Sequence, residues 1–188
     1  LPILYKYLKS KNYSDELLRD SGLFNVDERR GMYDKFWNRV IFPIMDVNNR
    51  VIGFGGRVMG DGKPKYLNSP ETDLFKKGDV LYNLDLAKRP ARDKNLVVVM
   101  EGYMDVVSTA QAGVDVAVAT LGTAVTPEHL RLLWQLSKEP VLCLDGDAAG
   151  LRAMLRAAEV ALPLITPGHS LRFAVLPAGE DPDTYIQK

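Results

Sequence analysis

Carboxylate side chains follow two short apolar runs in the second half of the sequence. The runs lie at residues 96–100 and 141–144, and the carboxylates that follow them are Glu101, Asp105, Asp145 and Asp147. Runs of branched apolar residues bounded by glycine are typical of buried parallel strands. Open α/β sheets form their sites beyond the carboxyl ends of such strands. We therefore predict that these four carboxylates meet at one edge of one sheet.

Carboxylates held this close repel one another, and a divalent cation would relieve that repulsion. Mg²⁺ favours oxygen ligands and is commonly held by a few carboxylates together with substrate phosphates. Two such ions would stabilise both the attacking and the leaving oxygen of a phosphoryl displacement. A third acidic segment, Glu180-Asp181-Pro182-Asp183, follows the last predicted strand and is expected at the same edge. The pattern favours a metal-dependent phosphoryl-transfer site.

The elements that position these residues alternate regularly after Pro90. We predict strands at 96–100, 116–119, 141–144 and 171–176, with helices near 104–112, from Thr126 and over 151–162. Thr126-Pro127-Glu128 is a helix start, because threonine caps, proline suits the first turn and an acid favours the positive end of the helix dipole. This βαβαβαβ order predicts a parallel sheet covered by helices.

The first half of the sequence predicts a smaller α+β subdomain with an antiparallel sheet. Residues 1–31 are expected to be helical, with a helix start at Ser14 and a stop at Gly22. Residues 32–90 are expected to form extended segments separated by long loops. Within them, Asn48-Asn49 predicts a hairpin turn and Pro43 indicates an edge strand. We place the domain division between 1–94 and 95–188.

The charge of the chain is uneven, although its formal net charge over 188 residues is zero. Residues 1–94 hold 18 Lys and Arg against 13 Asp and Glu, and residues 95–188 hold 6 against 11. The asymmetry predicts a basic surface in the first half and an acidic site in the second. The single cysteine, Cys143, excludes an intramolecular disulfide and a cysteine-based zinc site, which fits a reducing cytosol. No apolar stretch is long enough to span a bilayer.

The strand end at Glu101-Gly102 and the later Asp145-Gly146-Asp147 resemble the Toprim domain of primases and topoisomerases. Further segments resemble bacterial DnaG-type primases and occur in that family's order. They are residues 33–44, 50–57, 64–72, 75–78, 81–82, 101–105, 121–124 and 180–183. The block Pro-Lys-Tyr-Leu-Asn-Ser-Pro-Glu-Thr at 64–72 is specific to these primases among Toprim enzymes.

The resemblance implies template-directed synthesis of RNA primers in the bacterial cytoplasm, at the replication fork. A 3′-hydroxyl would attack the α-phosphate of a nucleoside triphosphate on a single-stranded DNA template. The implied ligands of Mg²⁺ or Mn²⁺ are Glu101, Asp105, Asp145, Asp147, Asp181 and Asp183, of which the first four would be catalytic. The implied contacts to nucleotide or nucleic acid are Arg39, Arg57, Lys65, Tyr66, Asn68 and Lys77. Basic side chains beside glycine-rich loops suit phosphate contacts.

Several family features are missing from the sequence. Trp37 stands where the family often has arginine, which argues against a phosphate contact at that position. The family's zinc-binding module and the helical region that contacts the replicative helicase have no counterpart. The sequence begins at Leu1, without a start methionine and within the family's core, so we expect a piece of a longer protein.

Two other functions remain open at this stage. A metal-dependent phosphohydrolase could use Asp145 as its nucleophile, although such enzymes usually carry Thr or Ser shortly after the second Asp, where Ala148-Ala149 stands. A nucleic-acid binding module with a structural metal is the non-enzymatic alternative. His129 and His169 are interpreted as structural or solvated residues.

Overall fold

The chain divides into two units by its internal contacts. In the computed structural model, which describes residues 3–188, the first unit runs to Ile44 and continues over Val51–Lys76. The second consists of Met45–Arg50 and Lys77–Lys188. These contacts group residues 77–94 with the second unit, and the division of domains after residue 94 stays a prediction.

The first unit begins with two helices and a hairpin. They are α1 (Ile3–Ser10), α2 (Asp15–Asp20), β1 (Phe24–Asp27) and the antiparallel β2 (Gly31–Asp34). Ser14 starts α2 as predicted, and its Oγ accepts the N–H of Leu17 at 3.2 Å. The prediction of helix to residue 31 is wrong from β1 onward. Asp27 accepts the N–H groups of Arg29 and Arg30, both at 2.9 Å, and so stabilises a hairpin turn instead.

Three antiparallel strands complete this unit. They are β3 (Arg39–Met45), β4 (Val51–Val58) and β5 (Tyr66–Asn68), in the order β3-β4-β5. Pro43 lies on the edge strand β3, as expected for a residue that cannot donate to a ladder. The predicted turn is also confirmed, since Asn49 has a left-handed φ of 61°. A Cβ at Gly53 would lie 3.2 Å from the Phe75 ring, which is fully buried.

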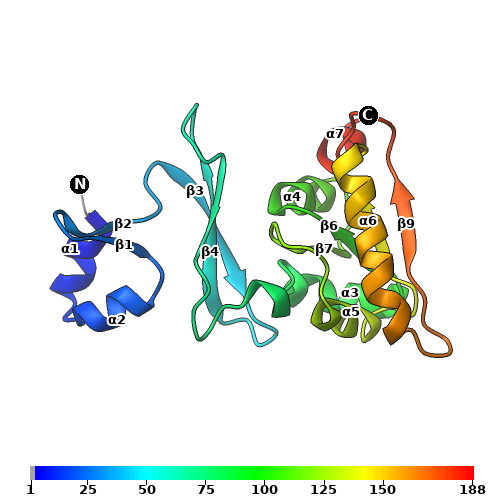
Figure 1. Cartoon of the computed structure of the whole chain (residues 1–188), viewed down its shortest axis with the longest axis horizontal. Helices are drawn as coiled ribbons and strands as arrows, with labels where there is room; N and C mark the ends of the chain where they lie inside the picture. Colours follow the sequence, from blue (N-terminus) through cyan, green and yellow to red (C-terminus); the bar gives the residue numbers. More distant parts are fainter. Residues whose placement is uncertain (1–2) are drawn as a thin grey trace. The chain divides into compact units, whose positions relative to one another are not determined.

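A four-stranded parallel sheet organises the second unit (Figure 1). Its strands are β6 (Val98–Met100), β7 (Ala117–Ala119), β8 (Val141–Leu144) and β9 (Arg172–Val175), in the order β7-β6-β8-β9. Its helical segments are η1 (Lys77–Asp79), α3 (Leu84–Lys94), α4 (Tyr103–Gln111), α5 (Pro127–Trp134), α6 (Ala148–Ala161), η2 (Leu162–Leu164) and α7 (Pro182–Ile186). The predicted βαβαβαβ order is confirmed.

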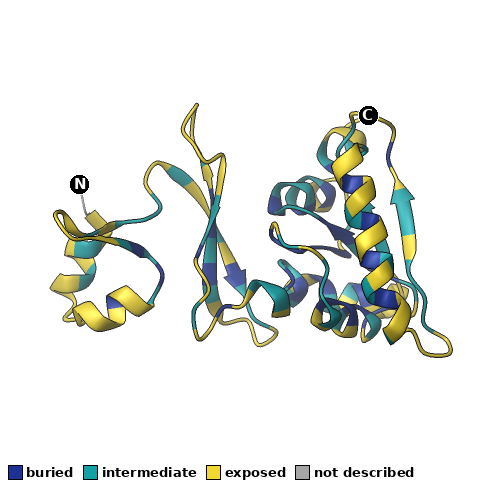
Figure 2. Cartoon of the chain, viewed as in Figure 1, coloured by how far each residue is buried: buried dark blue, intermediate teal, exposed yellow. Residues whose placement is uncertain are grey.

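Alternation along the strands gives the sheet two apolar faces. Val99, Val118 and Leu142 pack in one cluster with apolar residues of α3, α5 and α6. Met100, Ala117 and Ala119 pack in another with Val106 of α4. Figure 2 shows the buried residues of these strands in dark blue. Burial on both faces explains why the strands are continuous apolar runs in the sequence.

Helix α3 corrects the prediction of extended structure up to residue 90. Pro90 lies inside this helix, where it removes one backbone hydrogen bond. Leu84, Ala87 and Ala91 nevertheless form one stripe that is buried in the larger apolar cluster. Packing therefore outweighs the local cost of the proline. No helix within residues 3–188 has the length and apolarity needed to cross a membrane.

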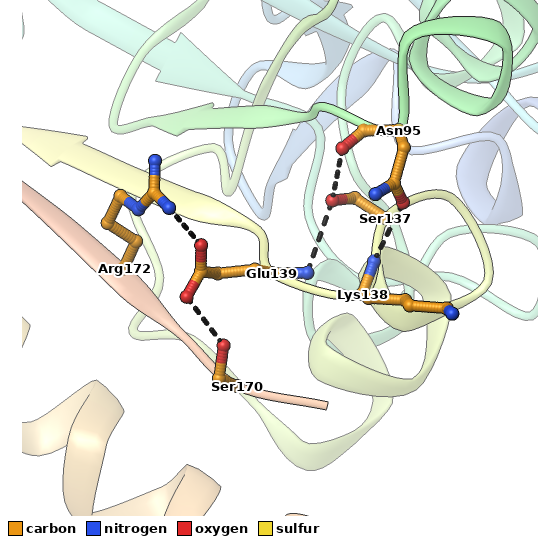
Figure 3. A network of polar contacts seen from close by, with 6 residues as sticks. All are labelled: Asn95, Ser137, Lys138, Glu139, Ser170 and Arg172. Carbon is orange, nitrogen blue, oxygen red and sulfur yellow. Dashed lines mark hydrogen bonds and ion pairs between the residues drawn. The ribbon is translucent and has the colours of Figure 1, made fainter. Parts of the chain in front are cut away.

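A polar network holds the segments that enter the sheet at its amino-terminal edge (Figure 3). Asn95 follows α3 and has a left-handed φ of 47°. Its carbonyl accepts a hydrogen bond from Ser137 Oγ at 2.9 Å, and its side-chain Oδ1 accepts one from the Lys138 N–H at 3.1 Å. Glu139 in turn accepts from Ser170 Oγ at 2.8 Å and from the guanidinium of Arg172. These bonds tie together the approaches to β6, β8 and β9.

We predict that Asn95→Ala lowers the free energy of unfolding by about 1 to 2 kcal/mol, because alanine loses the side-chain acceptor and resists the left-handed backbone. Asn95→Gly loses the same acceptor but accepts that backbone, so it should be roughly 1 kcal/mol more stable than the alanine variant. Urea unfolding followed by circular dichroism measures both. Equal stabilities for the two variants would contradict a backbone contribution at this position.

Candidate active site

The predicted acidic residues follow three neighbouring strands of the parallel sheet. Glu101 and Asp105 follow β6, Asp145 and Asp147 follow β8, and Asp181 and Asp183 follow β9. Strands β6, β8 and β9 are adjacent and parallel, so their carboxyl ends share one edge. We call these six residues the acidic edge. Helices α4 and α7, which carry or follow four of them, are in contact.

The charges of the acidic edge act on one another. Burial raises the pKa of the Glu101 carboxyl, and the negative charges of Asp145, Asp105 and Asp147 raise it further. Burial likewise raises the pKa of Asp145, with added repulsion from Asp181 and Asp147. No ion pair found within residues 3–188 joins a basic side chain to a carboxylate of the acidic edge. Among the described residues, no ion pair therefore offsets this repulsion.

Asp105 is the most perturbed carboxyl of the acidic edge. Burial raises its pKa to about 6, and the charges of Asp145, Asp181 and Asp183 act in the same direction. The N–H of Gly102 donates to Oδ2 of Asp105 at 3.1 Å and opposes this rise. The same bond fixes the start of α4, because Asp105 occupies the third helical position.

The turn at Gly146 joins the end of β8 to the loop after β9. The Gly146 N–H donates to the carbonyl of Glu180 at 2.8 Å, and the Gly179 N–H donates to the carbonyl of Gly146 at 3.1 Å. A Cβ at position 146 would lie 2.1 Å from the carbonyl oxygen of Pro177, so only glycine fits there. Because of this close approach, the negative charge of Asp181 raises the pKa of Asp145.

Two members of the acidic edge also cap helices. Asp147 Oδ1 accepts the N–H of Gly150 at 2.7 Å and starts α6, and Asp181 Oδ1 accepts the N–H of Thr184 at 2.7 Å and starts α7. A Cβ at Gly150 would lie 2.1 Å from the Asp145 carbonyl, so the first turn of α6 also requires glycine. Capping fixes the backbone of both aspartates at the sheet edge.

The donor chemistry of the acidic edge fits a divalent cation. Its side chains supply only carboxylate oxygens, which are the ligands of hard cations, and their mutual repulsion is what such a cation would offset. In residues 3–188, however, no three His, Cys, Asp or Glu side chains converge in an arrangement that could hold a metal ion. The residues lie at one edge, and a complete coordination geometry is not formed among them.

Three predicted nucleic-acid contacts come together in the first unit. Arg57 pairs with Tyr66 across β4 and β5, and its guanidinium lies 6.0 Å from the centre of the Tyr66 ring. The Lys65 ammonium lies 5.6 Å from the same ring centre. We call these three residues the cationic ladder. Tyr66 is 42% exposed, so its ring remains accessible.

The other predicted contacts have different surroundings. The Arg39 guanidinium donates hydrogen bonds to the carbonyls of Gly56 and Lys65 at 3.3 and 3.4 Å. It therefore links β3 to β4 and to the start of β5. Asn68 pairs with Gly55 on the β4–β5 ladder. Lys77 belongs to the second unit, where it begins η1.

Sequence reasoning missed hollows in both units. One, of about 320 Å³, lies beside Glu101 and is lined by the loop 120–125 and by Arg156 of α6. This loop contains the segment 121–124, which carries part of the family resemblance, but no sequence pattern indicated Arg156. Another, of about 580 Å³, lies in the first unit against Tyr33, Lys35 and Trp37. Trp37 is 71% exposed there.

Comparisons with known proteins match both halves of the chain. A family model described as the DNA primase catalytic core, N-terminal domain, matches residues 2–88, and a Toprim-like model matches residues 98–186. The chain is 52% identical over 171 residues to the DNA primase of Escherichia coli strain K12, which covers 91% of this chain and 29% of that protein. The chain belongs to the bacterial DnaG-type primases.

Solved structures of the family have the same fold. A crystal structure of a DNA primase domain from Pseudomonas aeruginosa matches with a TM-score of 0.86 at 49% identity, over 92% of this chain and 54% of that one. A DnaG primase catalytic domain bound to ssDNA matches with a TM-score of 0.86 at 50% identity, over 92% and 56%. The predicted family and fold class are thereby confirmed, and divalent metal use is general in Toprim primases.

We predict that, in this chain without bound metal, Asp105→Asn raises the free energy of unfolding at pH 7.5 by about 1 kcal/mol, after allowing for solvent screening. The pKa of this carboxyl is about 6 in the folded chain against 3.8 ordinarily, so the folded state binds the proton more tightly. The contribution of Asp105 to stability is therefore present below pH 4 and lost as the pH rises through 6.

Asparagine keeps the acceptor for the Gly102 N–H and removes the buried charge. Urea unfolding in EDTA at pH 4 and pH 7.5 measures the effect, which should be confined to the higher pH. A variant that is destabilised equally at both pH values would show that repulsion at Asp105 is not the cause.

Proposed function

We propose that this chain is part of a DNA primase that joins ribonucleotides on a single-stranded DNA template. Membership of the DnaG-type primases supports this, as does the DnaG catalytic domain whose solved structure is bound to ssDNA. The observation that carries the proposal is that six carboxylates follow three neighbouring parallel strands at one edge of the sheet. Because the chain spans 29% of the Escherichia coli relative, the activity is proposed for the whole protein.

We further propose that the acidic edge holds Mg²⁺ or Mn²⁺. The ligands would come from Glu101, Asp105, Asp145, Asp147, Asp181 and Asp183. When bound, the ions would supply positive charge at the attacking and leaving oxygens of a nucleotidyl transfer. The chain's own contribution is to fix the carboxylates: the Gly102 N–H orients Asp105, and the Gly146 turn holds the Asp181 loop against Asp145.

The cationic ladder is proposed to hold the nucleic-acid backbone, with Tyr66 offering its ring to a base. Arg57 and Lys65 would neutralise phosphates, and stacking on an exposed aromatic ring tolerates any base. Arg39 and Asn68 are proposed to support the cationic ladder within the first unit. Lys77, in the second unit, is proposed to contact the phosphates of the incoming nucleoside triphosphate. A replicative helicase would bind through a region outside this chain, and the protein would act in the bacterial cytoplasm.

Primer synthesis by the full-length protein separates this proposal from the two alternatives. A primase extends a labelled RNA on a single-stranded template and requires nucleoside triphosphates. A phosphohydrolase would instead release phosphate without extending RNA. A binding module would retain the single strand and transfer no nucleotide.

We predict that the double variant Asp145→Asn/Asp147→Asn loses stabilisation by divalent metal. Mn²⁺ at about 100 times its Kd stabilises a folded protein by about 2.7 kcal/mol, and the double variant should show little of this gain. Asparagine retains the capping acceptor at position 147, so α6 should persist. Thermal unfolding with and without MnCl₂ measures the shift.

Asp115→Asn is the matched control, because Asp115 precedes β7 and pairs with Lys94 away from the acidic edge. Its metal-induced shift should equal that of the unaltered chain. A double variant that is still stabilised by Mn²⁺ as much as this control would exclude Asp145 and Asp147 as ligands.

We predict that Arg57→Ala/Lys65→Ala weakens single-stranded DNA binding and flattens its dependence on salt. Each phosphate contact to a single strand contributes about 0.7 to the slope of log K against log salt, so the loss of two contacts should reduce the slope by roughly 1.4. Fluorescence anisotropy from 50 to 300 mM NaCl gives the slope, with Lys94→Ala as the control for loss of an exposed cation. An unchanged slope would place the phosphate path elsewhere.

A further inference from the structure

His129 is fully buried at the start of α5, and neither the acidic edge nor the cationic ladder uses it. Its Nδ1 accepts the backbone N–H of Thr126 at 3.3 Å. The proton of the neutral imidazole therefore lies on Nε2, which is 3.0 Å from the carbonyl oxygens of both Lys77 and Val80. One nitrogen of the ring caps a helix, and the other holds a separate segment of the chain.

Thr126 holds the same segment with its hydroxyl. Its Oγ donates to the carbonyl of Gly78 at 2.6 Å while it accepts the His129 N–H at 3.1 Å. A Cβ at Gly78 would lie 3.4 Å from the methyl group of Thr126, so the two segments leave little room for a side chain at position 78. Three carbonyls within residues 77–80 are thus fixed by two side chains of a single helix start.

The residue type at position 129 is informative. A capping box usually has Glu or Gln at the third helical position, where the side chain only has to accept the N–H of the cap residue. Glutamate at this site would present oxygens to the carbonyls of Lys77 and Val80 and could donate nothing to them. Histidine performs both tasks, because it accepts at Nδ1 and donates at Nε2.

The topology of the second unit places the start of α5, to which this segment is bonded, at the carboxyl edge of the sheet. Helix α5 begins after β7, so its amino terminus lies at the carboxyl edge of the sheet, on which Glu101 also lies. Tyr82 is bonded to Ala119, the last residue of β7, through both backbone groups at 2.8 and 3.2 Å. The loop 120–125, which leads to Thr126, lines the hollow beside Glu101.

We propose that His129, assisted by Thr126, is a positioning residue that fixes the backbone of Lys77 at the carboxyl edge of the sheet, so that the lysine meets the phosphates of the incoming nucleoside triphosphate. The proposal rests on the proposed function, because it assigns Lys77 to that substrate. Its physical basis is that fixing the backbone beforehand removes ordering from the binding step. Loss of the imidazole would leave the sheet in place and release the carbonyls of Lys77 and Val80, with only the Thr126 bond to Gly78 remaining.

The test is a set of variants in the full-length protein, assayed for primer extension and for direct binding of a fluorescent nucleotide analogue. His129→Ala should lower kcat/KM for nucleoside triphosphate by roughly 10- to 100-fold, mainly through KM. His129→Gln should recover most of the activity, because its amide can accept from Thr126 and donate toward Lys77 and Val80. His129→Ala/Lys77→Ala should be no worse than Lys77→Ala, since both variants act through one side chain.

Asn95→Ala is the control for stability, because it weakens the opposite edge of the same sheet and touches nothing at the acidic edge. It should leave KM and nucleotide binding unchanged. If His129→Ala does not fold, Thr126→Val removes the hydroxyl bond to Gly78 and should raise KM in the same direction.

The inference is overturned if His129→Ala binds nucleotide normally, if its effect is independent of the Lys77 substitution, or if Lys77→Ala leaves KM unchanged. Failure of the proposed function would give a different result, because the unaltered full-length protein would then not extend primers at all.

Discussion

Mutual repulsion among carboxylates is the constraint on which the second unit depends. Glu101, Asp105 and Asp145 all have raised pKa values from burial and from neighbouring negative charge, so their proximity works against folding. A loosely held edge would separate them. The parallel sheet resists this because its strands are buried on both faces and are joined by the Asn95 network at the far edge. Stability is concentrated away from the acidic edge, as expected where a site stores unfavourable charge.

Helix starts supply part of the compensation. Asp105, Asp147 and Asp181 each accept a backbone N–H at the beginning of α4, α6 and α7, where the helix dipole is positive. Three residues of the acidic edge therefore also begin helices of the second unit. This double role explains why the acids follow the strands so closely in sequence. It also explains why asparagine is a better test of these charges than alanine: asparagine removes the charge and retains the capping acceptor, whereas alanine removes both.

Local patterns predicted the sheet and the acidic edge because both depend on short stretches of sequence. Apolar runs marked all four strands, and the carboxylates follow them directly. The β1–β2 hairpin was missed because its strands, Phe-Asn-Val-Asp and Gly-Met-Tyr-Asp, contain no continuous apolar run. Helix α3 was missed because it contains Pro90, and its structure is decided by a buried apolar stripe. The Gly146 contact with residue 177 and the bonds from His129 to residues 77 and 80 join segments more than 30 residues apart, so no local pattern could reveal them. His129 was predicted to be structural or solvated, and it is buried.

The cationic ladder, like the acidic edge, gathers side chains of like charge, but its charges are positive. Arg57 and Lys65 lie on one tyrosine ring, where the π electrons offset some of their mutual repulsion, whereas Arg39 has its guanidinium engaged by two carbonyls. Like charges gathered in this way favour a polyanion, just as gathered carboxylates favour a cation. The zero net charge of the chain therefore conceals two groups of like charge with opposite signs, one in each unit. On the proposed function, binding of template and of metal should each add to stability, because each relieves a repulsion that the fold alone leaves in place.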